Sequence, residues 1–215
     1  MNKTKPVPSA LVRTSRALAH DVDLLTFGEP TAYVYNPLVY ARAPSERYLE
    51  RYGAPKKEAL FVGMNPGPFG MAQTGVPFGD IAMVRDFLGI EGRTERPAKE
   101  HPKRAIEGFA CKRSEVSGTR LWGFVKTRFV TPERFFARFF VWNYCPLVFM
   151  ETSGANRTPD KLPKHELAPL LARCDRALVE VADALGVELV IGVGAWATAR
   201  ATEAFAGRDM RIGTV

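Results

Sequence analysis

The sequence predicts a single α/β domain in which a four-stranded parallel sheet is flanked by helices on both faces. Short apolar stretches alternate along the chain with segments of helical periodicity. Such alternation is typical of parallel strands joined by helices that cover both faces of the sheet. The length of 215 residues is that of one ordinary domain, and no internal repeat or linker divides the chain.

The first part of the chain is expected to form two helices, a strand and a third helix. Residues 7–26 mix apolar and basic positions at helical spacing. The stretch SERYLERYG is typical of a short helix with Ser45 as N-cap and Gly53 just after its end. The continuous apolar run ALFVG, residues 59–63, indicates a strand that is buried on both faces. A helix over 80–88 follows an intervening loop.

The middle of the chain is expected to hold a long polar excursion, a helix and the second strand. Residues 91–118 are polar, contain Pro and Gly, and predict an extended segment. The next helix begins with Thr131 as N-cap and Pro132 at the first helical position. The run FFVWNYCPLVFM, residues 139–150, predicts one buried strand.

The last part predicts two helices and two strands. The clearest helix covers 165–185, with one apolar stripe and Gly186 as its stop. The run VELVIGVG, residues 187–194, predicts the third strand. A helix closed by Gly207 follows, and MRIGTV, residues 210–215, predicts the beginning of the fourth strand.

The positive charge of the chain is unevenly distributed. The net charge is +7, and the segment 96–138 holds 11 Lys and Arg against 4 Glu. Six aromatic residues lie in the same segment: Phe109, Trp122, Phe124, Phe129, Phe135 and Phe136. Basic residues interleaved with aromatic ones suit a surface that binds nucleic acid. On charge alone, a solvated face above a few core aromatics explains the pattern equally well.

Cysteine content and the N-terminal sequence limit the classes of protein. The three cysteines, Cys111, Cys145 and Cys174, are far apart and form no CxxC pair. We therefore expect no disulfide framework, no zinc site and no iron–sulfur cluster. The first twenty residues lack an apolar core of secretory length, and no apolar run is long enough to cross a membrane. A cytoplasmic protein without a signal peptide or membrane association is expected.

The stretch GMNPGPFGMAQTGVPFG, residues 63–79, follows the first predicted strand. It matches neither a Walker A sequence nor GxGxxG. Pro66 and Pro68 remove two backbone donors that a phosphate cradle would use, and they stiffen the loop. Gly67 and Gly70 allow another group to approach the backbone closely. A stiff loop that carries polar and aromatic residues is suited to a flat, neutral ligand.

An asparagine at the end of the second predicted strand belongs to the same crevice. Ligands of parallel sheets bind outside the carboxyl ends of the strands, so Asn143 and the loop are expected to face each other. An amide side chain offers a donor and an acceptor side by side. These properties predict a pocket for a hydrogen-bonding ring such as a nucleobase.

The loop closely resembles the first active-site motif of the single-strand-selective monofunctional uracil-DNA glycosylases, a branch of the uracil-DNA glycosylase superfamily. The stretch WNYCPLVFM, residues 142–150, resembles the base-reading strand of that family. The resemblance runs from about residue 25 to the C-terminus. It implies a DNA repair hydrolase that cleaves the N-glycosidic bond of flipped-out uracil and related damaged bases. The implied mechanism is water-mediated and monofunctional.

The same resemblance assigns roles to residues of the loop that surround the attacking water. Asn65 would orient and polarise this water. Met64 and Gly67 would line the water site and the pocket. Without a lysine in the motif, a Schiff-base lyase step is not expected.

Three further residues are implied to hold the base. Met71 would lie against it, Phe78 would stack on its ring, and Asn143 would read its N3 and O4 edge. No metal ion or organic cofactor is expected.

The expected partner is DNA, single- or double-stranded, which contains uracil or related damaged bases. Lys112, Arg113 and Arg120 of the basic segment are expected to contact its phosphates. We expect a monomer. We also expect a protein of bacterial type that is associated in function with the nucleoid. Two alternatives remain at this point: a glycosylase specialised for xanthine or hypoxanthine, and a non-catalytic protein that binds damaged bases in DNA.

The sequence departs from the family pattern at its C-terminus. The family's second motif, His-Pro-Ser-Pro, follows the fourth strand, and its His would donate to the leaving base. The present sequence stops at RIGTV, so residues 1–215 are expected to be one domain without this motif, and the natural product is expected to continue past Val215. His20, His101 and His165 do not match the motif. His101, in the basic loop, and His165, at a helix start, are expected at the surface.

Overall fold

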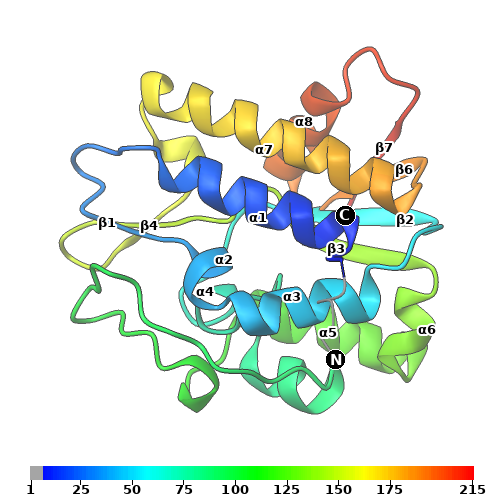
Figure 1. Ribbon diagram of the computed structural model, residues 1–215, viewed down its shortest axis with the longest axis horizontal. Helices are drawn as coiled ribbons and strands as arrows, with labels where there is room; N and C mark the ends of the chain where they lie inside the picture. The colour runs from blue at the N-terminus through cyan, green and yellow to red at the C-terminus, as the bar shows by residue number, and fades with distance from the viewer. Residues whose placement is uncertain (1–6) are drawn as a thin grey trace, which may run out of the picture.

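The computed structural model describes residues 7–215. The six residues before them, which begin the stretch expected to lack a secretory core, lie outside the described part. The central feature is a four-stranded parallel sheet with strand order β3-β2-β6-β7 (Figure 1). Its strands are β2 (Ala59–Gly63), β3 (Phe139–Asn143), β6 (Leu189–Gly192) and β7 (Arg211–Thr214). The predicted fold class is confirmed.

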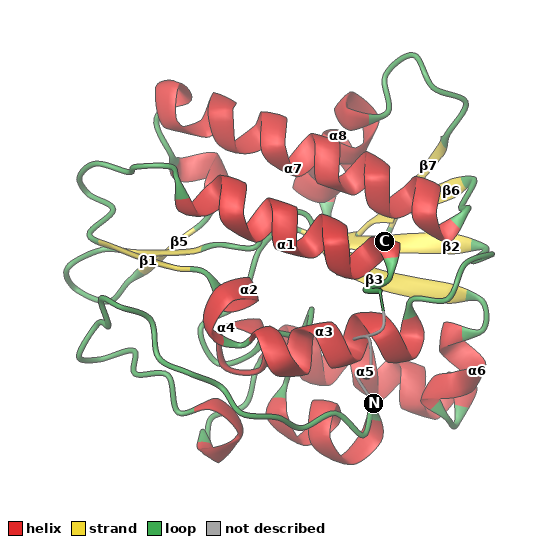
Figure 2. Cartoon of the chain, viewed as in Figure 1, coloured by secondary structure: helices red, strands yellow, loops and turns green. Residues whose placement is uncertain are grey.

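Helices cover both faces of this sheet, as Figures 1 and 2 show. One face carries α1 (Ala10–Asp23), α7 (Lys164–Leu185) and α8 (Ala195–Ala204). The other face carries α3 (Arg42–Tyr52), α5 (Val116–Phe129) and α6 (Pro132–Phe136). The apolar sides of these helices and the strands form one large core, whose fully buried members include Trp122, Tyr48 and Phe140.

The second predicted strand, 139–150, is wrong as a single element. Only β3 belongs to the parallel sheet, and the chain leaves that sheet after Asn143. Pro146 follows in a segment without regular structure, where its missing N–H cannot continue a ladder. Residues 148–150 then form β4 (Val148–Met150) in a separate antiparallel sheet with β1 (Tyr33–Tyr35) and β5 (Asn156–Arg157). The sequence analysis did not predict this second sheet.

Helix boundaries agree with the sequence where the capping residues are unambiguous. Thr131 caps α6 by accepting a hydrogen bond from Arg134 N, and Gly186 ends α7 with a positive φ of 64°. Ser45, by contrast, is not an N-cap. It is buried inside α3, because the helix begins at Arg42 and tolerates Pro44 in its first turn.

Two further segments differ in detail from the prediction. The helix expected over 80–88 contains the π-helix η1 (Met83–Phe87), in which Leu88 N donates to Met83 O at 2.9 Å. The excursion 91–118 is largely irregular, but its last residues already belong to α5. The remaining short helices are α2 (Pro37–Tyr40), α4 (Met71–Thr74), η2 (Gly108–Ala110) and η3 (Pro159–Lys161).

No helix in the described range 7–215 combines the length and apolar character needed to span a bilayer. Cys111, Cys145 and Cys174 are all buried, and none is in a disulfide.

Candidate active site

The glycine- and proline-rich loop begins where β2 ends and runs beside the exit of β3. The register pairs Gly63 with Asn143 at the ends of the two strands. Beyond this pair, Tyr144 N donates to Gly63 O at 2.8 Å and Cys145 N donates to Met64 O at 2.9 Å. The loop and Asn143 are therefore held at one edge of the sheet, as the sequence predicted.

A buried glutamine that the sequence analysis did not single out fixes the far side of the loop. Gln73 is only 1% exposed. Its Nε2 donates to the carbonyls of Pro68 at 3.1 Å and Ala105 at 3.2 Å. Its Oε1 accepts from the N–H groups of Glu107 at 2.9 Å and Gly108 at 3.0 Å. Because both ends of the amide are used, the loop is tied firmly to the basic segment.

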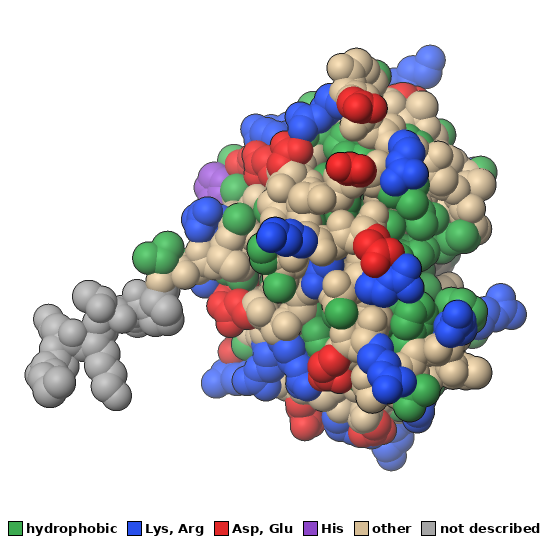
Figure 3. Space-filling model, turned by 90° about the vertical axis from the view of Figure 1, so that its right-hand side faces the viewer, with side chains coloured by type: hydrophobic (Ala, Val, Ile, Leu, Met, Phe, Trp, Pro, Cys, Tyr) green, Lys and Arg blue, Asp and Glu red, His purple; other side chains and the backbone are tan. Residues whose placement is uncertain are grey.

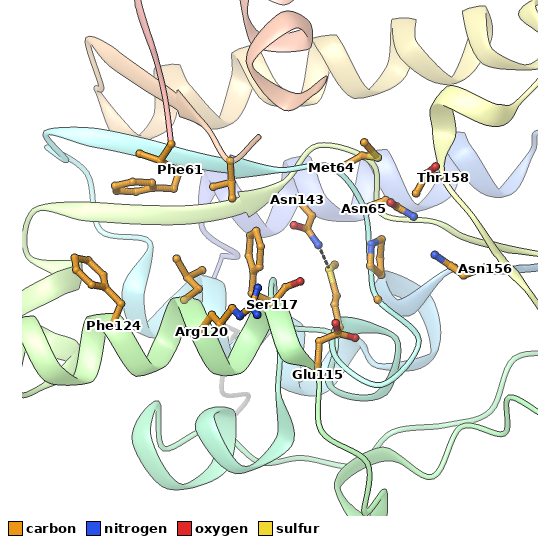
Figure 4. Close-up of a pocket in the computed structure, with 17 residues that line it drawn as sticks. Phe61, Met64, Asn65, Glu115, Ser117, Arg120, Phe124, Asn143, Asn156 and Thr158 are labelled. Carbon is orange, nitrogen blue, oxygen red and sulfur yellow. Dashed lines mark hydrogen bonds between the residues drawn. The ribbon is translucent and has the colours of Figure 1, made fainter. Parts of the chain in front are cut away.

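A cavity of about 720 Å³ opens at this edge of the sheet, with α5 along one side (Figure 4). Every residue predicted for catalysis or base binding lines it: Met64, Asn65, Gly67, Met71, Phe78 and Asn143. Most of the remaining lining is apolar. The structure thus brings together one loop and one strand end around a space that is large enough for a nucleobase.

Phe78 and Asn143 meet above Gly63. A Cβ added at Gly63 would lie 2.5 Å from Asn143 Oδ1 and 2.5 Å from Phe78 Cζ, so only glycine fits there. Phe78 has a φ of 54°, which is uncommon for a bulky residue. Its carbonyl accepts a hydrogen bond from Trp122 Nε1 at 3.0 Å. The ring is therefore held in a fixed position beside the amide.

We expect Gly63→Ala to lower uracil release by roughly 10-fold to 100-fold, because the new methyl group must displace the Phe78 ring or the Asn143 amide, and misplacement of this size is costly in an active site. Single-turnover rates of the variant and of Gly123→Ala provide the measurement. An added Cβ at Gly123 meets no atom within 4 Å, so this control should keep the parent rate. A parent rate in Gly63→Ala would contradict the packing described here.

The side chain of Asn143 is buried and oriented. The residue is 5% exposed, and its Nδ2 donates to the sulfur of Met71 at 3.2 Å. Sulfur is a weak acceptor, so a ligand with a better acceptor can take over this amide hydrogen. Asn143 and Met71, two of the three residues predicted to hold the base, are thus in direct contact.

Within residues 7–215, the Asn65 side chain is anchored through one end of its amide. Its Nδ2 donates to the carbonyl of Leu147 at 3.2 Å. This bond leaves Oδ1 as an acceptor at the cavity wall, which is the function needed to hold a water molecule.

The cavity contains two ionisable side chains, Glu115 and Arg120, among residues 7–215. Burial raises the pKa of the Glu115 carboxyl, and the negative charge of Asp80 raises it further. The backbone N–H groups of Phe69 and Ser117 oppose this shift because they stabilise the charged form. All other lining side chains are neutral, which suits a neutral ligand.

The three predicted phosphate-binding residues do not share one place. Arg120 lines the cavity, whereas Lys112 and Arg113 are exposed outside it. The guanidinium of Arg113 lies 3.8 Å from the ring centre of Phe69, at the tip of the loop. Within the described chain, none of the three basic side chains has a carboxylate partner within 4.0 Å. Their charge is free to attract an anion.

The prediction that His101 lies at the surface is wrong. His101 is 1% exposed; its Nδ1 accepts from Lys103 N at 3.0 Å and its Nε2 lies 3.0 Å from Thr152 O. The ring also packs edge-on against Tyr33. It therefore anchors the basic segment to the second sheet. The side chains of His20 and His165 are exposed, as expected for His165.

Several cavity residues were missed by the sequence analysis. Glu115, Ser117 and Leu121 come from the N-cap and first turns of α5, and the first two lie in the segment 91–118 that was predicted to be extended. Asn156 comes from β5 of the second sheet, which was not predicted, and Thr158 directly follows this strand (Figure 4). The one available signal was Glu115, an isolated acid in a strongly basic segment. Within residues 7–215, no group of three or more His, Cys, Asp or Glu side chains is arranged to bind a metal ion.

The geometry of the fold and cavity agrees with comparisons to known proteins. The family model described as the uracil DNA glycosylase superfamily matches residues 50–213. The chain belongs to the uracil DNA glycosylase superfamily, as its resemblance implied.

Particular relatives lie in one branch of that superfamily. The chain is 48% identical over 204 residues to the single-strand selective monofunctional uracil DNA glycosylase of Mus musculus, covering 95% of this chain and 73% of that protein. It is 51% identical over 187 residues to the protein of the same name from Rattus norvegicus, covering 87% and 67%. The crystal structure of Pedobacter heparinus SMUG2 has the same fold, with a TM-score of 0.65 at 17% identity, over 95% of this chain and 86% of that one.

Proposed function

We propose that the protein is a DNA repair glycosylase that hydrolyses the N-glycosidic bond of uracil and related damaged bases in DNA. Relatives that are about half identical over most of the chain are named as monofunctional uracil DNA glycosylases. The observation that carries the proposal is the convergence of Asn65, Phe78 and Asn143 on one cavity. A cavity that is lined by amides and, apart from Glu115 and Arg120, by neutral side chains suits an uncharged base that must leave a sugar.

The geometry supports a definite binding mode for a flipped-out uracil. The ring stacks on Phe78, whose position is fixed by its backbone and by Trp122. The Asn143 amide donates to O4 and accepts from N3–H, and its bond to Met71 is given up in exchange. Binding by this amide edge distinguishes uracil from cytosine, which presents an amine at position 4.

Asn65 acts on the attacking water. Its anchored amide accepts a hydrogen bond from water through Oδ1 and aims the oxygen at the sugar carbon C1′. The bond between C1′ and the base breaks with the electron pair on the base, while donors around the cavity stabilise the departing anion. No lysine is among the cavity residues of the described chain, which supports a hydrolytic step without a covalent intermediate.

Incubation with an oligonucleotide that contains one uracil tests the proposal. We expect alkali-sensitive strand cleavage after incubation and intact strands before alkali. A panel with xanthine and hypoxanthine, each in single and double strands, measures the base and strand preference. Binding to the uracil oligonucleotide without any base release would contradict the proposal and indicate a damage-binding protein. Release of purines alone would indicate the deaminated-purine specificity.

The DNA surface is proposed to extend from the cavity over the basic segment 96–138. Basic and acidic side chains are interspersed on the face shown in Figure 3, which is turned by 90° from Figure 1. Ion pairs such as Arg16–Glu46 and Arg208–Asp183 neutralise basic side chains elsewhere on the molecule. Arg113 and Arg120 have no such partner in the described chain, and they flank the cavity loop and the cavity.

Replacing Lys112, Arg113 and Arg120 with Gln is expected to weaken binding to all DNA sequences alike. The slope of log K against log salt should become shallower by roughly 0.7 to 0.9 for each lost phosphate contact. Fluorescence anisotropy over a salt series measures it. The matched control replaces Arg13, Lys56 and Lys164, which are exposed on other segments. Equal slopes in both triple variants would show that the three residues do not contact phosphates.

We also propose that the protein acts as a monomer in the bacterial cytoplasm. The three buried cysteines, none of them in a disulfide, support a reducing compartment. Light scattering coupled to gel filtration and cell fractionation test the two statements. A mass of twice 23.8 kDa, or recovery outside the cytoplasm, would contradict them.

A further inference from the structure

Hydrolysis in this cavity moves a proton from the attacking water to an acceptor, and a side-chain base beside the water would speed this step. Asn65 can orient the water, but a neutral amide is too weak a base to accept its proton. Among the lining residues of the described chain, only Glu115 and Arg120 are ionisable, and arginine is always protonated. Glu115 is therefore the one lining side chain in residues 7–215 that can act as a base.

The position of Glu115 against the cavity loop is built into the sequence. The residue occupies the N-cap position of α5, and its side chain points toward the loop (Figure 4). A Cβ added at Gly67 would lie 2.2 Å from its Oε2, and one at Gly70 would lie 2.7 Å from its Cγ. Two glycines thus leave the space that the side chain fills. Gly67 is two residues from Asn65 in the same stiff loop, and Glu115 and Asn65 line the same cavity.

The surroundings hold Glu115 in place and shift the pKa of its carboxyl. Asp80 Oδ2 accepts hydrogen bonds from Glu115 N at 3.1 Å and from Ser114 Oγ at 2.9 Å, which joins the start of α5 to the segment after Phe78. The charge that acts on the Glu115 carboxyl is that of Asp80 from this segment, and Arg120 from α5 lines the same cavity. The cavity loop presents only backbone and neutral side chains. Burial and Asp80 raise the pKa of Glu115, and a base is most effective when its pKa approaches the working pH.

We propose that Glu115 is a further catalytic residue, which accepts the proton of the attacking water. The step rests on the proposed function. The water oxygen forms the bond to C1′, the bond from C1′ to the base breaks, and its electron pair leaves with the base. The proton of the water moves to the Glu115 carboxylate and passes from there to solvent or to the departing base anion. Asn65 orients the same water and takes no proton.

Single-turnover uracil release by Glu115→Gln as a function of pH tests this role. Gln keeps the size and one acceptor oxygen, so DNA affinity and melting temperature should stay at the parent values. At neutral pH the rate should fall about 100-fold. In the parent, the rate should fall as pH drops through the pKa of Glu115, because the protonated carboxyl cannot accept a proton. This acid limb should be absent in the Gln variant.

Two further variants separate catalysis from support of the loop. Glu115→Asp keeps a carboxylate on a shorter side chain and should restore part of the rate together with an acid limb. Glu107→Gln removes an exposed acid of the same segment and should behave as the parent. A parent rate and an unchanged acid limb in Glu115→Gln would overturn the inference. So would a loss of rate that is explained by a lower melting temperature, with the acid limb retained. If the parent released no base at any pH, the proposed function and this inference would both fall.

Discussion

Replacing Asn65 with Ala is expected to lower the single-turnover rate of uracil release by about 100-fold or more while the protein folds normally. The amide anchors on Leu147 O through Nδ2, and its Oδ1 is the acceptor available to a water molecule at that wall. Removing a group that places the nucleophile costs on the order of 10² to 10³ in rate. Quenched reactions on a uracil-containing oligonucleotide, with enzyme in excess, measure the rate.

The DNA affinity and the melting temperature of the same variant are the controls. Asn65 lies near the start of the cavity loop and carries no charge, so DNA affinity should stay near the parent value. The melting temperature should change little, since the lost hydrogen bond joins a half-buried side chain to a backbone carbonyl. Release at the parent rate by Asn65→Ala would remove this residue from the water site.

The second large effect is expected for Asn143→Asp. A carboxylate accepts hydrogen bonds but cannot donate to O4, and its charge faces a carbonyl oxygen in a largely dry pocket. Loss of one well-placed donor to a developing anion costs roughly 100-fold or more. Cytosine carries an amine at position 4, and a carboxylate can accept a hydrogen bond from this amine. The variant should therefore release uracil far more slowly and shift its relative preference toward cytosine.

Parallel assays on uracil and cytosine oligonucleotides measure this shift. Asn143→Ala is the matched control, since it should lose uracil release without any gain for cytosine. The melting temperature must be followed as well, because residue 143 is 5% exposed and a buried charge destabilises the fold. Unchanged uracil release in a folded Asn143→Asp variant would exclude this side chain from base reading.

The parts of the fold that could be predicted are those whose local pattern and tertiary environment agree. The run at 59–63 is apolar throughout because β2 lies between β3 and β6 with helices on both faces. The pattern at 139–150 is equally apolar, yet it serves two sheets. The apolar character of the run gave no sign that the chain passes from one sheet to the other, and only Pro146 marked the break between the two strands.

Helix α5 was not predicted because part of its sequence disfavours a helix. It contains Gly118 and Gly123, each of which weakens a helix in isolation. Packing supplies the reason for the first: a Cβ at Gly118 would lie 2.2 Å from the carbonyl oxygen of Phe78. The helix thus approaches the cavity loop closely enough to fix Phe78. Local propensity cannot reveal such a tertiary demand.

The candidate site divides in the same way. Residues 64–78 and Asn143 could be predicted because they belong to two contiguous motifs, and the parallel sheet places both at one edge. Gln73 and Glu115 act through partners that are distant in sequence, so their roles depend on the fold of the basic segment. A pocket for a neutral base was predicted, whereas its one acidic side chain, Glu115, was not.

The central claim is that a flipped uracil binds between Phe78 and Asn143 with its sugar beside Asn65. A crystal structure of Asn65→Ala with a uracil-containing oligonucleotide tests it most directly, because slow hydrolysis preserves the substrate. We predict that the uracil ring stacks on Phe78 with the Asn143 amide at its N3 and O4 edge. A uracil that remains stacked in the DNA, or one bound elsewhere while this cavity stays empty, would contradict the claim.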